Sequence, residues 1–462
     1  MSWFDVIVQN LPEVSRPAQK QLPFSEKLKW TAITLVLFFV LGLIPLYGLS
    51  QNELERFEFL SIILGASFGS LISLGIGPLV TGSIVLQLLN GSGLVKFDLS
   101  TQEGKAKYQG VQKVMGVFFV LFEAAIYVLM GGLAPAPALL GTSLYGYLQA
   151  ILIFQLCLGG ILIMFMDEVI SKWGFGSGIS LFIAAGVAQE VFIRAFSPLH
   201  SVQNPDAYVG AIPELFRSLA NGDATTAGIL IGSLVATVVV FVVAVYAESM
   251  KVEIPLSFGR VRGHGIRWPL QFIYTSNIPV ILVAALQANI QLWARLLENW
   301  GHPILGTFAG NSPATGLVAW LYAPDLLRKI ITGSMTTQDI GAATAHILFM
   351  TIGSVIFAWF WVQTAGMDAK SQAAQIIKAG LQVPGFRKDE RIMEHVLERY
   401  ITPLTIMGAI AVGLIAALAD LGGALSRGTG ILLTVMIIYK LYEEITKQHM
   451  MDMNPMLKKM ME

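Results

Sequence analysis

The sequence has little charge for its length. Lys, Arg, Asp and Glu make up 13% of the 462 residues, whereas hydrophobic residues make up 55%. A soluble domain carries about 25% charged residues, so much of this protein's surface is predicted to face lipid. The formal net charge is zero, which excludes a global attraction to nucleic acid or anionic lipid and leaves any basic patch local.

Cysteine is almost absent, and motifs for chemistry are missing. Cys157, the single cysteine, lies in an apolar run, which excludes a disulfide framework or a zinc cluster. The six histidines form no H-E-x-x-H motif and no P-loop is present, so no metal or other cofactor is predicted. A G-x-S-x-G match at 65–69 lacks the strand-to-helix turn, histidine and acid that a nucleophile needs. We therefore expect no enzyme, and an energy source supplied by a partner.

Long apolar runs dominate what is present. About 20 apolar residues cross a bilayer core as a helix, and ten such segments predict an all-α membrane protein. They are 30–48, 74–92, 110–132, 145–166, 176–196, 226–247, 269–294, 338–364, 400–419 and 427–446. Residues 1–29 lack the apolar core and cleavage site of a signal peptide, and are predicted to be an amphipathic cytoplasmic segment.

The basic residues follow this topology. Of the 30 Lys and Arg residues, 23 fall on the side of the N-terminus and 7 on the other side. The positive-inside rule therefore predicts that both termini, including the tail 447–462, are cytoplasmic.

Ten spans divide into two halves of opposite orientation, at 30–196 and 226–446, joined by an external loop at 197–225. The second span of each half carries a break, Gly75-Ile76-Gly77-Pro78 in one and Asn277-Ile278-Pro279 in the other. Paired Gly/Pro-broken segments indicate a central site between inverted repeats. Ordinary proline kinks are the alternative, since they are common in membrane helices.

Residues 57–92 are too long for one span, because a helix of that length reaches about 54 Å against a core of about 30 Å. We predict a half-helix at 57–70, entering from outside, followed by a span at 74–92. The half-helix is rich in small residues, including Ser61, Gly65, Ser67 and Gly69. It must lie inside protein or line a cavity, because its ends cannot be satisfied in lipid.

Few polar residues interrupt the predicted spans. Glu123 lies well inside the third, Thr81 lies in the second, and Asn277 lies at the start of the seventh. A secondary transporter built on an inverted repeat should show a cluster of intramembrane acids or bases. A single acid with uncharged partners favours a polar seam between helices, so a passive channel is preferred over a transporter or an intramembrane enzyme.

Two cytoplasmic loops, at 248–268 and 365–399, are longer than topology requires. Each places basic residues beside glycine: Arg260 and Arg262 in the first, and Arg387 and Lys388 in the second. Such tips can contact RNA phosphates or an acidic docking protein. The alternative is that these residues only set topology.

Several motifs together resemble one family. They are Lys27-Leu28-Lys29-Trp30, Leu74-Gly75-Ile76-Gly77-Pro78, Gly91-Ser92-Gly93, the run at 176–186 (GSGISLFIAAG), Val252-Glu253-Ile254-Pro255, Ser276-Asn277-Ile278-Pro279-Val280-Ile281, Gly385-Phe386-Arg387 and Gly428-Thr429-Gly430. The chain resembles the SecY family, the alpha subunit of the general protein translocon, in its archaeal–eukaryotic branch.

This resemblance implies an hourglass channel between the two halves, with 57–70 as the plug of the external funnel. The constriction would be a ring of aliphatic residues: Ile76, Val80, Ile179, Ile183, Ile281 and Leu433. The lateral gate to lipid would lie between the second and third spans and the seventh and eighth. Its polar cluster would be Thr81, Glu123 and Asn277.

The resemblance also implies partners and a location. The two loops would dock a ribosome through Arg260, Arg262, Arg387 and Lys388. A SecE-type gamma subunit and a small beta subunit would complete the complex, and a nascent polypeptide with its signal sequence would be the cargo. The expected location is the plasma membrane of an archaeon, with the endoplasmic reticulum membrane as the alternative.

Overall fold

The computed structural model describes residues 12–18, 22–49, 69–91, 94–95, 97, 101–129, 132–200, 206–258, 265–309, 312–378, 381–382 and 389–453. Long helices dominate this part of the chain, as the all-α prediction required. A helix corresponds to each predicted span: α2 (Phe24–Gly42), α4 (Gly77–Gly91), α5 (Gln102–Leu129), α6 (Ser143–Trp173), α7 (Gly178–Phe196), α9 (Ala224–Ser249), α10 (Ile278–Asn299), α13 (Thr337–Thr364), α15 (Glu390–Leu421) and α16 (Gly428–Met453).

Apolar length separates these helices into two groups. Seven segments of the described chain are long and apolar enough to cross a membrane, and α4 is a shorter apolar helix. In α2 (Glu26, Lys27 and Lys29) and in α16 (Lys440, Glu443 and Glu444), a group of charged residues falls within every stretch long enough to cross a membrane. Helix α2 begins at Phe24, so Lys27 and Lys29 lie inside it rather than in the segment predicted to precede it.

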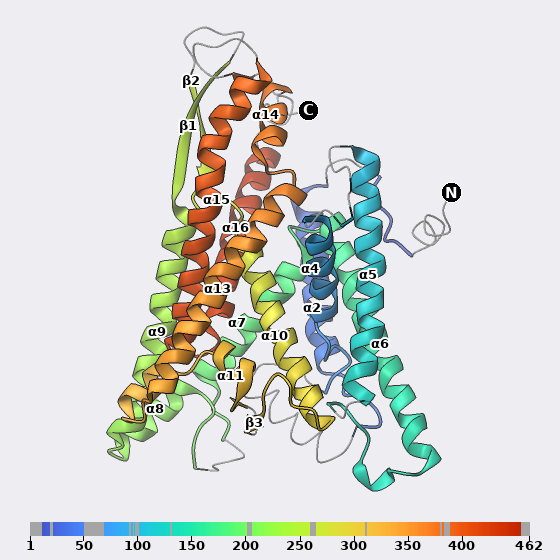
Figure 1. Cartoon of the computed structure of the whole chain (residues 1–462), viewed down its shortest axis with the longest axis vertical. Coiled ribbons are helices and arrows are strands. Elements are labelled where there is room, and N and C mark those ends of the chain that lie inside the picture. Colours follow the sequence, from blue (N-terminus) through green and yellow to red (C-terminus); the bar gives the residue numbers. More distant parts are fainter. Residues whose placement is uncertain are drawn as a thin grey trace.

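The helices form two packed groups (Figure 1). Helices α2, α5 and α6 lie on one side, α9, α13 and α15 lie on the other, and α4, α7 and α10 lie between them. The first group holds the helices from α2 to α7, and the second holds those from α9 to α16. Helix α16 packs against α7, and α4 packs against α10 and α13. The contact between the groups therefore involves several helices from each.

The two broken spans begin in the same way. Gly75 has a φ of 55°, α4 starts two residues later at Gly77, and Pro78 follows. Ser276 has a φ of 60°, and α10 likewise starts two residues later with Pro279 in its first turn. A left-handed residue turns the chain and proline suits the first helical turn. The paired breaks are thus turns that start two helices, rather than kinks within them.

The predicted seventh span starts too early. Residues from Gly265 to Gln271 form strand β2, and α10 begins only at Ile278. Strand β2 pairs antiparallel with β1 (Lys251–Phe258), in a register that places Lys251 opposite Gln271. Apolar composition misled the prediction here, because Leu270, counted in the predicted span, belongs to strand β2.

Strand β1 also pairs with β5 (Leu381–Gln382), so the two predicted cytoplasmic loops share a three-stranded sheet. Residues from both loops and the adjoining helix ends form one apolar core, which includes Ile254, Leu270, Ile376 and Leu397. The Tyr274 hydroxyl donates to the Met367 carbonyl at 2.7 Å. The loops are therefore one folded unit, which projects past the helix ends at the top of Figure 1.

Short elements complete the described chain. They are the 3₁₀ turn η1 (Pro137–Leu139), α8 (Ala211–Ala220), β3 (Phe308–Ala309), β4 (Ser312–Pro313), α11 (Gly316–Leu321), α12 (Leu326–Ile331) and α14 (Ala369–Lys378). Helices α8 and α11 lie at the end of the molecule opposite the β1–β2 hairpin (Figure 1).

Candidate functional site

The six aliphatic residues of the predicted constriction all belong to, or pack against, one extended apolar cluster. Val80 and Leu433 belong to an apolar cluster between the helix groups, and each is 5% exposed. The four isoleucines, Ile76, Ile179, Ile183 and Ile281, are half-buried and pack against the same cluster. They come from α4 and the turn before it, α7, α10 and α16. Both helix groups therefore contribute to a single aliphatic centre.

A polar cluster lies beside this centre. The Thr81 hydroxyl donates to Glu123 Oε1 at 3.1 Å, and Asn289 Nδ2 donates to Thr81 Oγ1 at 2.9 Å. Glu123 is buried on α5, Thr81 lies on α4 and Asn289 lies on α10. The cluster thus connects the second and third predicted spans to the seventh.

Asn277, the third predicted member, does not join this cluster in the described contacts. Its Oδ1 accepts a hydrogen bond from the Ser276 hydroxyl at 2.7 Å, at the start of α10. Sequence reasoning overlooked Asn289, although it is a polar residue in the middle of an apolar span with Gln287 and Gln291 nearby. That interruption marks Asn289 as a candidate, but it does not distinguish Asn289 from Asn277.

Most of the predicted plug and ribosome-docking residues lie outside the described residues. These are Ser61, Gly65, Ser67, Arg260, Arg262, Arg387 and Lys388. Gly69 and Ser70 are described and are not helical, so the predicted half-helix is wrong at its last two residues. Leu46 N donates to the Gly69 carbonyl at 2.8 Å and Leu71 N to the Ile44 carbonyl at 2.9 Å, so 69–71 runs antiparallel to 44–46.

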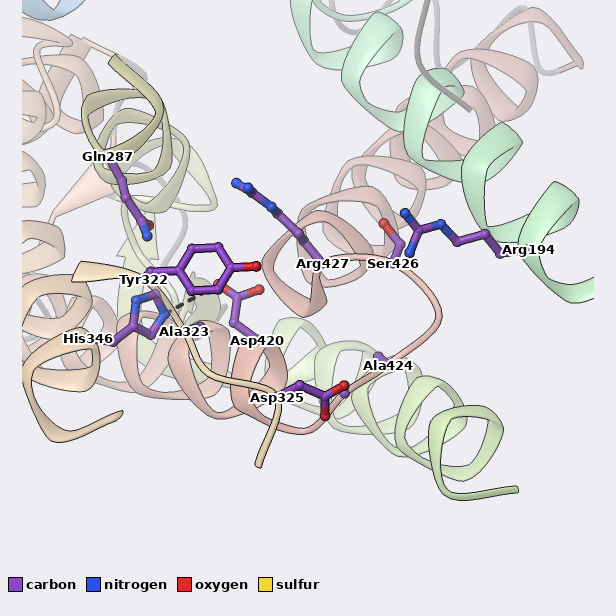
Figure 2. A pocket seen from close by; sticks show the side chains of 11 residues that line it. Arg194, Gln287, Tyr322, Ala323, Asp325, His346, Asp420, Ala424, Ser426 and Arg427 are labelled. Carbon is purple, nitrogen blue, oxygen red and sulfur yellow. Dashed lines mark ion pairs between the residues drawn. The ribbon is translucent and has the colours of Figure 1, made fainter. Parts of the chain in front are cut away.

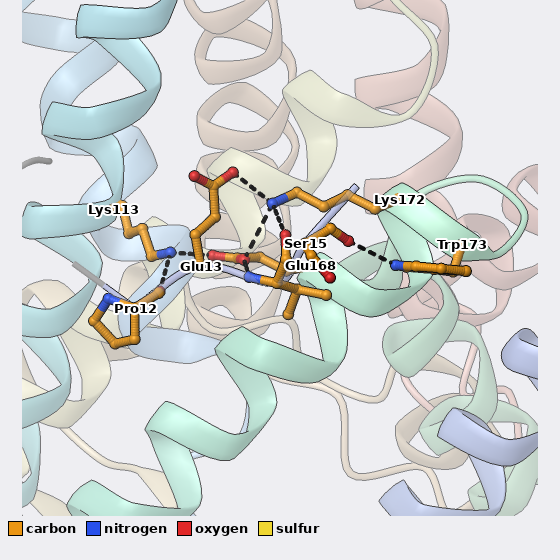
Figure 3. Close-up of polar contacts among 8 residues, drawn as sticks. Pro12, Glu13, Ser15, Lys113, Glu168, Lys172 and Trp173 are labelled. Atoms are coloured by element: carbon orange, nitrogen blue, oxygen red, sulfur yellow. Dashed lines mark hydrogen bonds and ion pairs between the residues drawn. The ribbon is translucent and has the colours of Figure 1, made fainter. Parts of the chain in front are cut away.

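The segment 12–18 forms a strap that contacts Lys113 within α5 and the C-terminal end of α6 (Figure 3). Lys172 on α6 pairs with Glu13, and Trp173 Nε1 donates to the Ser15 carbonyl at 2.9 Å. Lys113 on α5 donates to the Pro12 carbonyl at 2.6 Å and pairs with Glu168 on α6.

Glu168 also accepts from the strap, through the backbone N–H of Val14 at 2.9 Å. The hydrogen bond from Lys172 lowers the pKa of Glu13 below its usual value. Sequence reasoning missed this strap, because its contacts with α5 and α6 join residues 101 to 159 positions apart.

A cavity of about 190 Å³ is lined by residues of α7, α10, α13 and α15 and of the segments that follow α11 and α15 (Figure 2). Charged and polar side chains line it, including Arg194, Asp325, Asp420 and Arg427. His346 Nδ1 lies 2.8 Å from the Leu321 carbonyl, and its Nε2 lies 3.5 Å from Asp420 Oδ2.

Asp420 also accepts from the backbone N–H of Thr429 at 2.7 Å, in the first turn of α16. Asp420, near the end of α15, therefore contacts both His346 of α13 and the first turn of α16. Among the described residues no group of three or more His, Cys, Asp or Glu side chains is placed to hold a metal ion.

Apolar helices of membrane-spanning length, packed as two groups around a shared apolar cluster, define a polytopic helical membrane protein. The sequence model of the SecY family matches residues 70–442, and that of the plug domain of Sec61p matches residues 36–69. The protein translocase subunit SecY of Methanothermobacter thermautotrophicus is 45% identical to this chain, over 98% of this chain and 97% of that protein.

Two solved structures are also similar. A structure described as that of a protein-conducting channel is 40% identical, with a TM-score of 0.80 over 96% of this chain and 97% of that one. Sec61 in the canine ribosome–channel complex from the endoplasmic reticulum is 39% identical, with a TM-score of 0.78 and the same coverage.

The chain belongs to the SecY family. It is a multi-pass membrane protein of the archaeal plasma membrane and a subunit of the protein translocase.

Proposed function

We propose that this chain forms the pore of the translocon itself, with the aliphatic centre as its constriction and the α4/α5–α10/α13 contact as its lateral gate. The observation that carries the proposal is the convergence of six aliphatic side chains from both helix groups on one cluster. A ring of aliphatic side chains excludes ions by dewetting. It also offers no fixed hydrogen bonds to a passing peptide, so chains of any sequence can slide through.

The lateral gate is supported by the polar link between α4 and α10. The hydrogen bond from Asn289 to Thr81 connects the two sides at 2.9 Å. A single neutral hydrogen bond inside a membrane protein contributes only about 0.6 kcal/mol. A gate closed by such a contact can open when a hydrophobic segment offers competing apolar contacts.

Partners supply the driving force and complete the complex in this proposal. The similar Sec61 channel is described in a complex with a ribosome. A translating ribosome docked on the folded unit of 248–268 and 365–399 would push the chain, and gamma and beta subunits would join the alpha subunit. No catalytic step is assigned to this chain.

Photocrosslinking from Ile183 tests the pore. A photoreactive residue is placed at Ile183, and a ribosome is stalled while it makes a secretory protein. The same residue at Val238, which is 61% exposed on α9, serves as the matched control. We expect crosslinks to the nascent chain from position 183 and none from position 238.

A different result would reject the pore. If the stalled ribosome is docked and position 183 crosslinks only to neighbouring helices, the polypeptide does not pass the aliphatic centre. The secondary-transporter interpretation would then be the better account of the two packed halves.

A further inference from the structure

Helix α8 has its polarity reversed relative to a helix of a soluble protein. Its buried residues are Ala211, Glu214 and Ser218, whereas Phe216 is 70% exposed and Leu219 is 58% exposed. A surface helix in water turns its apolar stripe toward the core and its polar residues outward. The outward apolar face of α8 is therefore not the face expected of a helix surrounded only by water.

The buried polar face is fixed by specific contacts. Glu214 Oε2 accepts the backbone N–H of Tyr208 at 2.7 Å, and Arg217 Nε lies 3.4 Å from the same oxygen. Ala211 packs in a small apolar cluster with Ala195 of α7 and Leu425. These contacts fix the rotation of α8 about its axis, so Phe216 and Leu219 are held outward.

The two helices that pack against α8 also expose large apolar side chains. Helix α8 packs against both α7 and α9. Near α8 along the chain, Phe192 and Phe196 of α7 and Ile231 of α9 are exposed. In membrane-spanning helices, such side chains face lipid. With ten residues α8 is about 15 Å long, too short to cross the bilayer.

We infer that α8 lies in the membrane interface, at the end of the molecule opposite the β1–β2 hairpin, with Phe216 and Leu219 inserted between lipids. The helix follows α7 and precedes α9, so it is the connection between the two packed helix groups. An amphipathic helix of this kind inserts about 5–10 Å into the headgroup and acyl boundary. The connection between the groups would thus be held in the plane of the membrane. This inference does not depend on the proposed pore.

Depth-dependent fluorescence quenching tests the inference. Cys157 is the single cysteine, so Cys157→Ala gives a background for Phe216→Cys labelled with the environment-sensitive dye NBD. The matched control is Asn221→Cys, one residue past α8 and exposed. Both labelled proteins are reconstituted into vesicles, once as the full translocon complex and once as the chain alone. The dye is then quenched either by nitroxide-labelled lipids with the nitroxide at a shallow depth or by iodide added to the solution outside.

We expect shallow nitroxide lipids to quench the dye at 216, and iodide to quench it at least about threefold less than at 221, because the dye lies below the headgroups. Equal quenching of both positions by iodide would place α8 in water and overturn the inference. Protection of position 216 from both quenchers in the full complex would show that a protein subunit covers this face, which also overturns it. A labelled protein whose unfolding temperature falls is replaced by the Leu219→Cys variant, which tests the same face.

Discussion

Ile281 is a single side chain on which the seal of the proposed pore depends. It is half-buried on α10 and packs against the central aliphatic cluster. In Ile281→Asn an amide enters that cluster and can hold water by hydrogen bonds, an effect of about 1–3 kcal/mol. We expect resting ion conductance in planar bilayers to rise about tenfold or more, since about 1.4 kcal/mol changes a rate tenfold.

The matched control for that measurement is Ile281→Val, which keeps an aliphatic side chain and should leave the conductance low. Conductance of Ile281→Asn equal to that of the parent would remove this residue from the constriction.

The link between Thr81 and Asn289 can be measured by a double-mutant cycle. Thr81→Val and Asn289→Leu each remove the hydrogen bond between α4 and α10. Their effects on the free energy of unfolding in detergent should fall short of additivity by about 0.6 kcal/mol, the average for such bonds in membranes. The pair Thr81→Val and Thr237→Val, the latter on α9, should be additive. Additivity of both pairs would mean that the contact does not couple the helices.

Which asparagine joins this cluster could not be predicted from the sequence. The positions of Thr81 and Glu123 in their helices were predicted, and the hydrogen bond between them is present. Asn277 and Asn289 both lie in the predicted seventh span. The choice depends on where α10 begins, and the turn at Ser276 determines this. Periodicity alone does not encode that turn.

At the scale of elements, the strap of residues 12–18 should respond to acid. The pKa of Glu13 is lowered by its hydrogen bond with Lys172. Because the pKa of Glu13 is lower in the docked strap, the ionised carboxylate stabilises docking fully at a pH above the ordinary value of 4.5. This stabilisation is lost as the pH falls through the lowered pKa. Glu13 is 61% exposed, so solvent screens the pair and the effect is modest.

A nitroxide on Arg16→Cys, in the Cys157→Ala background, reports the strap by its EPR mobility. Mobility should increase below pH 4.5 in the parent, while Glu13→Gln should be mobile already at neutral pH and insensitive to acid. An identical pH response in both proteins would assign the transition to another group.

The helices themselves were predicted more reliably than their ends. Each of the ten predicted spans overlaps a helix, because about 20 apolar residues in succession have few alternatives. A hairpin or turn tip was expected in the loop 248–268, but the length of its strands and their pairing with β5 were not predicted, since a strand with one buried face carries a weaker signal. The strap was missed for a different reason: ion pairs between distant positions leave no local pattern.

For the whole molecule, joining α4 to α10 should stop transport. Thr81→Cys and Asn289→Cys replace side chains whose Oγ1 and Nδ2 atoms are 2.9 Å apart. A short crosslinker with two thiol-reactive groups and a reducible bond can therefore connect the two cysteines. We expect the linked protein to lose passage of polypeptide in proportion to the linked fraction, and a reductant to restore it. The reason is that the proposed gate separates these two helices.

The control link stays on one side of the gate. Gln112 on α5 donates to the Ser83 hydroxyl on α4 at 2.8 Å, so the pair Ser83→Cys and Gln112→Cys should accept the same linker with little loss of transport. Equal inhibition by both links would indicate general rigidity rather than a gate between α4 and α10.

The matching turns at Gly75 and Ser276 lie directly before α4 and α10, so each helix would tilt about its own turn. Ile76 lies one residue from the turn at Gly75, and Ile281 lies five residues from the turn at Ser276. The far end of the 15-residue α4, in contrast, is about 22 Å away from its turn. A swing of a few degrees therefore moves the distant helix ends much farther than it moves the isoleucines. In the proposed pore, the gap toward lipid would therefore widen while the aperture around a passing chain stays narrow.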